Sequence, residues 1–228
     1  MFGAEQHGAV DVKFLKRLFR HNESGPFSSS DYWAKRYERG KTSGSGSYGR
    51  LASYKADVIN QLVRDRAVGS VVEFGCGDGN NAALFDFETY TGVDVAPLVI
   101  SSAQIRFADR ETWQFVESHA FEAPASGYDL SMSLDVIYHL VEAAVFDRYM
   151  RDLVAASARY VLVYASDHDA ATKDVHVRHR RYSDWMAAHA PEFDHVQTWD
   201  HPYPMTETSD KNETSFAFFQ LFERGATA

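Results

Sequence analysis

Short apolar runs alternate along this chain with longer segments in which apolar residues recur at helical spacing. Leu51, Tyr54 and Val58 follow one another three or four positions apart, which is typical of an amphipathic helix. The predicted helices of this central region are 50–66, 98–107 and 145–158, and the predicted strands are 71–74, 91–95, 113–117, 128–134 and 160–165. This repeated alternation indicates an α/β fold with a doubly wound, mostly parallel sheet.

The C-terminal region departs from that alternation. A helix is predicted over 183–190, followed by strands over 195–200 and 215–223 with no helix between them. Two consecutive strands without a crossover helix form an antiparallel hairpin. The sheet is therefore expected to contain seven strands, and its closing hairpin separates it from a dinucleotide-binding fold.

The first 49 residues are predicted to form a helical arm and a lid. Val12, Leu15 and Phe19 share one helical face, with basic residues on the other, so this amphipathic face should pack against a lid, a dimer partner or a membrane surface. A lid or a homodimer through this helix is favoured, because few cations on an acidic protein attract lipid weakly. A second helix over 31–40 precedes the Gly-Ser run 42–49, which suits either a linker or a loop that closes over a ligand.

A glycine-rich turn at 73–79 is the strongest local signal. Glycines at 75, 77 and 79 make a turn without Cβ atoms after a buried strand, and a helix is expected to start within 80–85. Asp94 ends the next strand, where a carboxylate can bind a ribose diol. The pattern fits a dinucleotide enzyme or a structural turn, but S-adenosylmethionine (SAM) is favoured because a chain of 228 residues leaves little room for a separate dehydrogenase substrate domain.

Composition narrows the class of protein. The chain has 32 acidic and 23 basic residues, which argues against a general nucleic-acid binder. The only cysteine is Cys76, so no internal disulfide forms, and no apolar run reaches the roughly 20 residues that span a bilayer. A cytoplasmic protein that acts on a small-molecule or oligosaccharide acceptor is therefore expected.

Five motifs together resemble class I SAM-dependent methyltransferases, in particular a subgroup found in bacterial polysaccharide biosynthesis loci. They are WAKRY (33–37), the Gly-Ser loop through Tyr48 and Gly49, EFGCGDG (73–79), SLDVIYHLVE (133–142) and HVRHR (176–180). The resemblance runs from about residue 31 to 224. It implies a Rossmann-like methyltransferase domain over 50–228, preceded by the helical arm and lid over 1–49.

The resemblance also implies a function and a cofactor site. The expected reaction is O-methylation of a sugar or oligosaccharide hydroxyl, for instance the 1-OH of a methylated mannoside. The residues predicted to bind SAM are Trp33, Arg36, Tyr48, Glu73, Gly75, Cys76, Gly77, Asp94 and Val95. Trp33 and Arg36 would close on the cofactor, Tyr48 would cover it, and the glycines would admit it.

A histidine is the candidate general base. His139 follows Asp135 by four residues, so a helix beginning at Asp135 would place both side chains on one face. A histidine with a pKa near neutrality, oriented by a carboxylate, is suited to remove the proton of an acceptor hydroxyl. Alternatively, His139 only packs at this turn.

The dense basic cluster at 176–181 is the candidate acceptor site. An extended backbone there would let one side of the segment donate hydrogen bonds to a polyhydroxylated or anionic acceptor, whereas a solvated loop is the other interpretation. The predicted substrate-binding residues are Tyr138, His176, Arg178, His179 and Arg180.

Metal assistance is an alternative chemistry for the same edge of the sheet. Asp135 follows one predicted strand, and Asp167 and His168 follow the next. Carboxylates in such places can hold Mg²⁺, which lowers the pKa of a bound hydroxyl. Competing functions are methylation of a phosphate or carboxylate group and SAM binding without catalysis.

Overall fold

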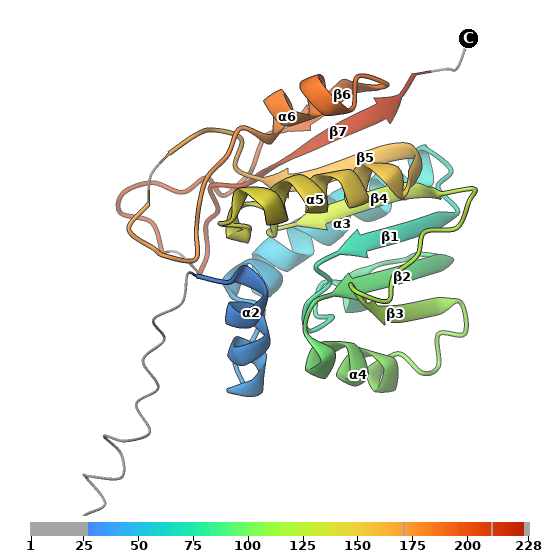
Figure 1. Ribbon diagram of the computed structural model, residues 1–228, viewed down its shortest axis with the longest axis horizontal. Coiled ribbons are helices and arrows are strands. Elements are labelled where there is room, and N and C mark those ends of the chain that lie inside the picture. Colours follow the sequence, from blue (N-terminus) through green and yellow to red (C-terminus); the bar gives the residue numbers. More distant parts are fainter. Residues whose placement is uncertain (1–26, 171, 211, 226–228) are drawn as a thin grey trace, which may run out of the picture.

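The computed structural model describes residues 27–170, 172–210 and 212–225. These residues form one seven-stranded sheet in the order β3-β2-β1-β4-β5-β7-β6 (Figure 1). The strands are β1 (Ser70–Phe74), β2 (Thr89–Asp94), β3 (Trp113–Glu117), β4 (Tyr128–Leu134), β5 (Ser157–Ala165), β6 (Phe193–Trp199) and β7 (Phe218–Arg224). The predicted fold class is confirmed, and the predicted amphipathic helix near Val12 lies outside the described residues.

The closing hairpin is also confirmed. The first five strands pair in parallel, whereas β7 pairs antiparallel with both β5 and β6. Strand β7 therefore lies between β5 and the edge strand β6. The carboxyl ends of the parallel strands face one edge of the sheet, which is where ligands bind in folds of this kind.

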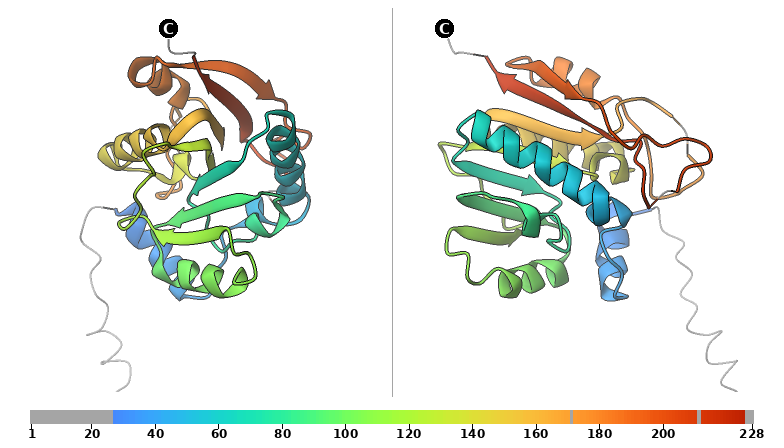
Figure 2. Two further views of the ribbon diagram at one scale, coloured as in Figure 1. Left: turned by 90° about the vertical axis from the view of Figure 1, so that its right-hand side faces the viewer. Right: turned by 180° about the vertical axis from the view of Figure 1, so that it is seen from behind.

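Helices cover the two faces of the sheet (Figure 2). They are α3 (Gly49–Asp65), α4 (Pro97–Arg106), α5 (Ala143–Ala155) and α6 (Tyr182–His189). A further helix, α2 (Ser29–Glu38), lies beyond the strand ends and packs against α4. Apolar residues of α3 and α4, such as Ile59 and Ile100, pack in one core cluster with Leu130 of the sheet. Residues of α5 and α6, such as Met150 and Met186, pack in a second cluster on the other face.

The prediction of a helix after the glycine turn is wrong. The chain between β1 and β2 holds only the short 3₁₀ helix Ala82–Leu84. The side chain of Asn60 on α3 donates to the Leu84 carbonyl and accepts from the Asp86 amide. These contacts satisfy backbone groups outside a helix, while Phe85 and Phe87 enter the core.

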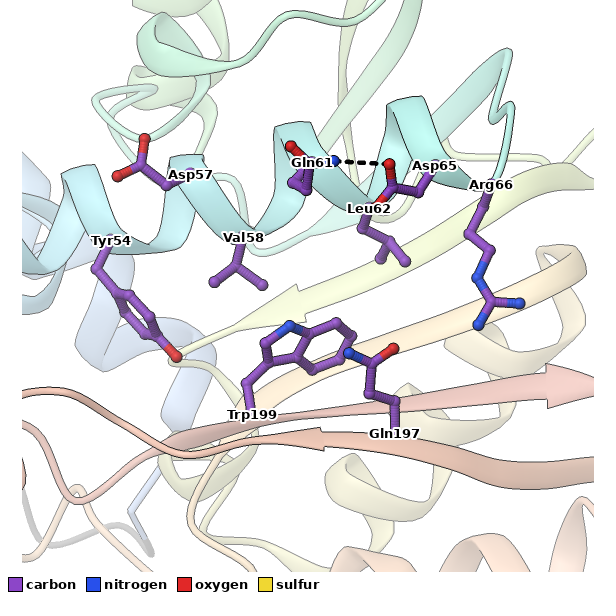
Figure 3. Close-up of a pocket in the computed structure, with 9 residues that line it drawn as sticks. All are labelled: Tyr54, Asp57, Val58, Gln61, Leu62, Asp65, Arg66, Gln197 and Trp199. Carbon is purple, nitrogen blue, oxygen red and sulfur yellow. Dashed lines mark hydrogen bonds between the residues drawn. The ribbon is translucent and has the colours of Figure 1, made fainter.

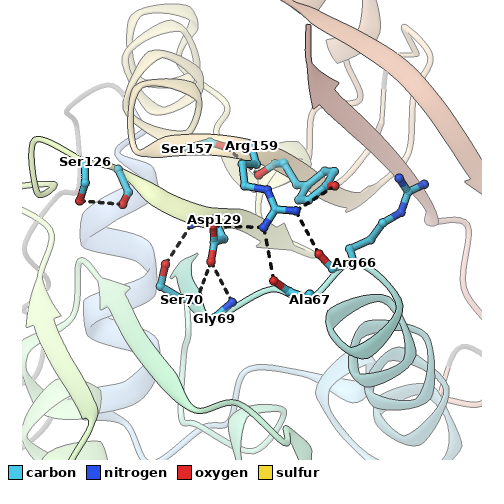
Figure 4. Close-up of polar contacts among 10 residues, drawn as sticks. Arg66, Ala67, Gly69, Ser70, Ser126, Asp129, Ser157 and Arg159 are labelled. Carbon is cyan, nitrogen blue, oxygen red and sulfur yellow. Dashed lines mark hydrogen bonds and ion pairs between the residues drawn. The ribbon is translucent and has the colours of Figure 1, made fainter. Parts of the chain in front are cut away.

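The opposite edge of the sheet is fixed by a carboxylate and a guanidinium (Figure 4). Asp129 accepts from the amides of Gly69 and Ser70, and Arg159 donates to Asp129 and to the carbonyls of Arg66 and Ala67. The guanidinium and these amides hold the pKa of Asp129 below its usual range, against the effect of partial burial. This network ties the start of β1 to β4 and β5.

A groove of about 450 Å³ lies between α3 and β6 (Figure 3). Val58, Leu62 and Trp199 give it an apolar floor, and Asp57, Asp65 and Arg66 lie at its rim.

Within the described residues, no helix is both long and apolar enough to cross a membrane.

Candidate active site

The glycine turn after β1 is held against the end of β2. Gly75 and Gly77 have φ of 82° and 56°, which is the left-handed region that side chains disfavour. The amides of Gly75 and Cys76 both donate to the Val93 carbonyl, at 2.7 and 3.1 Å. A Cβ on Gly75 would overlap the Val136 side chain. Both the backbone conformation and the space therefore require glycine in this turn.

Asp94 locks the same turn from the end of β2. Its carboxylate accepts from the Gly77 amide and from the Ala96 amide, both at 2.9 Å. Burial raises the pKa of Asp94, and these backbone donors oppose that shift. Because each carboxylate oxygen has two acceptor sites, the residue keeps capacity for the ribose diol predicted from the sequence. Val95, which is 43% exposed, follows it at the surface of the turn.

Glu73 and Cys76 lie beneath the turn rather than at its surface. The Tyr90 hydroxyl donates to Glu73 at 2.5 Å, and burial raises the pKa of this carboxyl to about 7. Burial also raises the pKa of the Cys76 thiol well above its usual value, so it stays protonated and unreactive. Both side chains support the shape of the turn, while their contact with cofactor stays a prediction.

The Gly-Ser segment 42–48 lies on the glycine turn. The Ser43 amide and the Tyr48 hydroxyl donate to the Asp78 carboxylate at 2.9 and 2.8 Å, and the Asp78 amide donates back to the Ser43 hydroxyl. A Cβ on Gly77 would collide with the Ser43 hydroxyl. Tyr48 therefore lies beside the glycine turn, where its hydroxyl contacts Asp78. That Tyr48 covers bound SAM stays a prediction.

Helix α2 places aromatic residues over the end of β4. Trp33 meets the His139 ring edge-on at 4.8 Å between centroids, and Tyr32 stacks on His176 at the same distance. His176 in turn stacks on His139 at 5.5 Å. Arg36 lies over Trp33 and donates to the Thr42 carbonyl, so it links α2 to the Gly-Ser segment.

His139 is held in one tautomer. Its Nδ1 lies 2.9 Å from the His176 carbonyl oxygen, which can only accept, so Nδ1 carries the proton and Nε2 keeps a lone pair. Burial lowers the pKa of His139 to about 4, so the ring is neutral at physiological pH. The residue has the form of a general base, although a backbone carbonyl orients it in place of the predicted carboxylate.

Asp135 is engaged by other partners. The Lys55 ammonium lies 2.7 Å from Oδ2, and the Tyr138 hydroxyl donates to Oδ1 at 2.7 Å. Gly46 of the Gly-Ser segment packs so closely on Oδ2 that a Cβ there would collide. The helix considered from Asp135 does not form: Asp135 has a φ of 62°, and only the 3₁₀ turn Ile137–His139 follows. Asp135 and His139 therefore do not pair as predicted: Asp135 contacts Lys55 and Tyr138, and His139 contacts the His176 carbonyl.

The extended backbone considered for 175–181 forms only in part: a turn lies at 175–176, and His179 pairs with Ala170 in an isolated antiparallel bridge. The guanidinium of Arg178 donates to the Val141 carbonyl, and that of Arg180 donates to the carbonyls of Leu140 and Val141. Both arginines thus hold the turn after β4. Because a guanidinium has five N–H donors, these bonds leave others for a substrate, and the role of both arginines in substrate binding stays a prediction.

His179 has a different environment. Its Nδ1 lies 2.6 Å from the Ser166 hydroxyl, its ring stacks on His168 at 4.7 Å, and it meets Phe216 edge-on. Tyr138 also meets Phe216 edge-on, at 5.0 Å. His179 and Tyr138 are therefore the two predicted acceptor residues that share an aromatic neighbourhood beyond the strand ends.

The predicted metal set does not form. Asp135 pairs with Lys55, Asp167 accepts from the Ser183 amide at the start of α6, and His168 stacks on His179. Among the residues that the structure describes, no three His, Cys, Asp or Glu side chains converge as metal ligands would. These residues follow β4 and β5, which are neighbours in the sheet, but each side chain contacts a different partner.

Lys55 is a site residue that the sequence interpretation missed. Its side chain is fully buried, with Asp135 and the Tyr164 ring as its neighbours. It lies four positions after Leu51 on the apolar face of α3, where a lysine is unusual. A lysine on this apolar face could have indicated a buried ion pair from the sequence alone, because a buried ammonium needs a carboxylate partner.

Comparison with known proteins decides the family. A family model described as a methyltransferase domain matches residues 48–203. The chain belongs to this methyltransferase family. Its cofactor is accordingly SAM, and the close backbone approach at Gly75 and Gly77, beside the Asp94 carboxylate, fits that cofactor.

Solved methyltransferases share the fold. The methyltransferase domain of bacterial CtHen1-C superposes with a TM-score of 0.57 at 21% identity, covering 75% of this chain and 97% of that one. Magnesium protoporphyrin IX methyltransferase from Synechocystis PCC 6803, in a structure with bound SAM, superposes with a TM-score of 0.56 at 16% identity, covering 96% and 100%.

A curated relative matches only in part. The mouse (Mus musculus) EEF1A lysine methyltransferase 4 is 29% identical over 108 residues, which are 43% of this chain and 40% of that protein. The similarity therefore covers less than half of either sequence. It does not carry the acceptor of that enzyme to this methyltransferase.

Proposed function

We propose that this methyltransferase acts on oxygen, at a hydroxyl of a sugar or oligosaccharide precursor in polysaccharide biosynthesis. The observation that supports the proposal best is the state of His139. Its Nδ1 proton is engaged by the His176 carbonyl, so its Nε2 lone pair is available beside Trp33 at the end of β4. A neutral, oriented imidazole suits removal of a hydroxyl proton.

SAM supplies the methyl group as an electrophile on a sulfonium. The turn that includes Gly75 and Gly77 admits the cofactor, Asp94 binds its ribose, and the Gly-Ser segment covers the turn and excludes water. His139 accepts the hydroxyl proton at Nε2 as the acceptor oxygen bonds the methyl carbon and the sulfur–carbon bond breaks. Proton, methyl group and S-adenosylhomocysteine account for all the atoms moved.

The sugar acceptor rests on the motif resemblance. Those motifs resemble enzymes of polysaccharide loci, and the most specific acceptor in that group is the 1-OH of a methylmannose precursor, as in the mycobacterial 1-O-methyltransferase. A phosphate or carboxylate acceptor is less well supported, because Arg180 is buried and donates to the carbonyls of Leu140 and Val141. Lysine N-methylation is the second candidate, since a relative that matches over 108 residues is named a lysine methyltransferase.

The test is turnover of His139→Gln with mannobiose, a neutral disaccharide with a free 1-OH, as acceptor. We expect the variant to lose about 10²–10⁴ in kcat while it still binds SAM, because a positioned base contributes that much. Tyr160→Phe, at the far end of β5, serves as the control and should keep wild-type turnover. Turnover of mannobiose by His139→Gln at the wild-type rate would refute the base, and methylation of a histone-type lysine peptide in place of mannobiose would favour the second candidate.

A further inference from the structure

Five polar side chains from five parts of the chain meet beyond the ends of β4 and β5. We call them the Asp135 cluster: Lys55 of α3, Asp135 after β4, Tyr138 of the following turn, Tyr164 of β5, and His201 after β6. The Lys55 ammonium lies 5.2 Å from the Tyr164 ring centre, and the Tyr164 and His201 rings are 5.9 Å apart. Asp135 exerts a Coulombic effect on both Tyr164 and His201.

Three members of the cluster are mutually satisfied. Asp135 receives Lys55 at one oxygen and the Tyr138 hydroxyl at the other. The lysine and aspartate charges therefore cancel, and their hydrogen bonds fix the positions of both side chains.

His201 carries a buried donor without an acceptor. Its Nδ1 accepts from the Tyr203 amide at 2.9 Å, so the ring proton must lie on Nε2. Burial lowers the pKa of His201, and the ring is therefore neutral. Its Nε2 atom is buried and has no hydrogen-bond partner.

Tyr164 carries a second such group. Its side chain is 1% exposed. Its buried hydroxyl lies near the Ser215 side chain but forms no hydrogen bond. Tyr160, four residues earlier on the same strand, accepts a hydrogen bond from Arg159. The unpartnered hydroxyl is thus specific to the end of β5 that adjoins Asp135.

Buried polar groups in folded proteins almost always have a partner. Two such groups lie here beside a fixed carboxylate, at the edge of the sheet where ligands bind in folds of this kind. We propose that the Asp135 cluster binds the acceptor of the methyl transfer, with the His201 Nε2–H donating to one hydroxyl oxygen and the Tyr164 hydroxyl bonding a second. This rests on the proposed function and assigns its acceptor-binding residues.

The charges of the cluster select the class of acceptor. Lys55 is neutralised by Asp135, and Arg50, which lies near His201, pairs with Glu213 at 2.9 Å. A phosphate or carboxylate group would therefore lose its hydration without meeting a net positive charge among these residues. A neutral polyol has no charge to desolvate, and its hydroxyls can pair with both groups that lack partners.

The experiment measures acceptor binding to the protein saturated with S-adenosylhomocysteine, by ligand-observed NMR titration. The probes are mannobiose and mannose 6-phosphate. We expect wild type to bind mannobiose in preference to the phosphate. Tyr164→Phe and His201→Leu should each weaken mannobiose binding about threefold to tenfold, as loss of one hydrogen bond does, without changing the affinity for S-adenosylhomocysteine.

Two matched variants control for structural damage. Tyr160→Phe removes a hydroxyl from the same strand, and His195→Leu removes an exposed imidazole from β6. Both should bind mannobiose as wild type does. Should Tyr164→Phe fail to fold, His201→Leu alone carries the test.

The outcomes separate this inference from the proposed function. Wild-type affinity of both variants for mannobiose, with the sugar still methylated, would overturn the inference alone. Tighter binding of mannose 6-phosphate than of mannobiose would overturn the neutral acceptor class. If wild type neither binds nor methylates mannobiose, while S-adenosylhomocysteine is bound, both the inference and the sugar acceptor are wrong.

Discussion

Burial decides the chemistry of His139. Trp33 and His176 cover its ring, and the pKa falls to about 4 because the charged form is desolvated. The hydrogen bond to the His176 carbonyl and the charge of Asp135 oppose this shift in the pKa, and the charge of Arg36 adds to it. The ring therefore stays neutral, and able to accept a proton, over the whole physiological pH range. The methyl-transfer activity of the enzyme should not fall as pH drops through 6.

This buried histidine should make stability depend on pH. The folded pKa lies below the ordinary value of 6.5, so the unfolded chain binds one more proton between pH 6.5 and about 4. The His139 contribution to stability is thus fully present above pH 6.5 and is lost as pH falls through that window, by about 3 kcal/mol at most. Denaturant unfolding of wild type and His139→Gln at pH 7.5 and 4.5 measures it, and equal pH dependence of the two would contradict the assignment.

Asp94 should matter for cofactor affinity. Asp94→Ala removes the ribose acceptor and the bond to the Gly77 amide, so SAM binding should weaken by about 1.5–3 kcal/mol. Asp129→Ala is the matched control, because Asp129 also accepts from two backbone amides but lies at the opposite edge of the sheet. Calorimetry that finds wild-type SAM affinity in Asp94→Ala would remove the ribose role.

At the level of elements, the hydrophobic pattern was sufficient for the strands and most helices. It failed where tertiary contacts replace helical hydrogen bonds: Asn60 holds the chain after the glycine turn, and Lys55 with Tyr138 holds Asp135 in a left-handed conformation. Such contacts join residues far apart in sequence. Periodicity within a short window carries no information about them.

The Gly-Ser segment gives a prediction at this scale. The Ser43 hydroxyl accepts from the Asp78 amide and bonds the Tyr37 hydroxyl, so Ser43→Ala should loosen the segment and speed proteolysis within 40–49. S-adenosylhomocysteine should slow that cleavage in wild type. Ser101→Ala on α4 is the control, since Ser101 bonds only within its own helix. Cleavage rates that neither the variant nor the ligand changes would leave the segment a simple linker.

At the scale of the molecule, parallel topology brings the site together. The glycine turn, Asp94, Asp135 and His139 come from different strands, and the order of strands predicted that they would share one edge. What the order could not show is which side chains would pair there. The arginines at 178 and 180 read as substrate ligands in the sequence, yet they satisfy carbonyls of the turn after β4.

The central claim is that this methyltransferase places its methyl group on oxygen. The most direct measurement is ¹³C NMR of the product after incubation with mannobiose and SAM labelled with ¹³C at the methyl group, because the chemical shift separates methyl bound to oxygen, nitrogen or carbon. We expect one new methyl ether signal with wild type and almost none with His139→Gln. A new signal from methyl on nitrogen or carbon, or no transfer while SAM is bound, would contradict it.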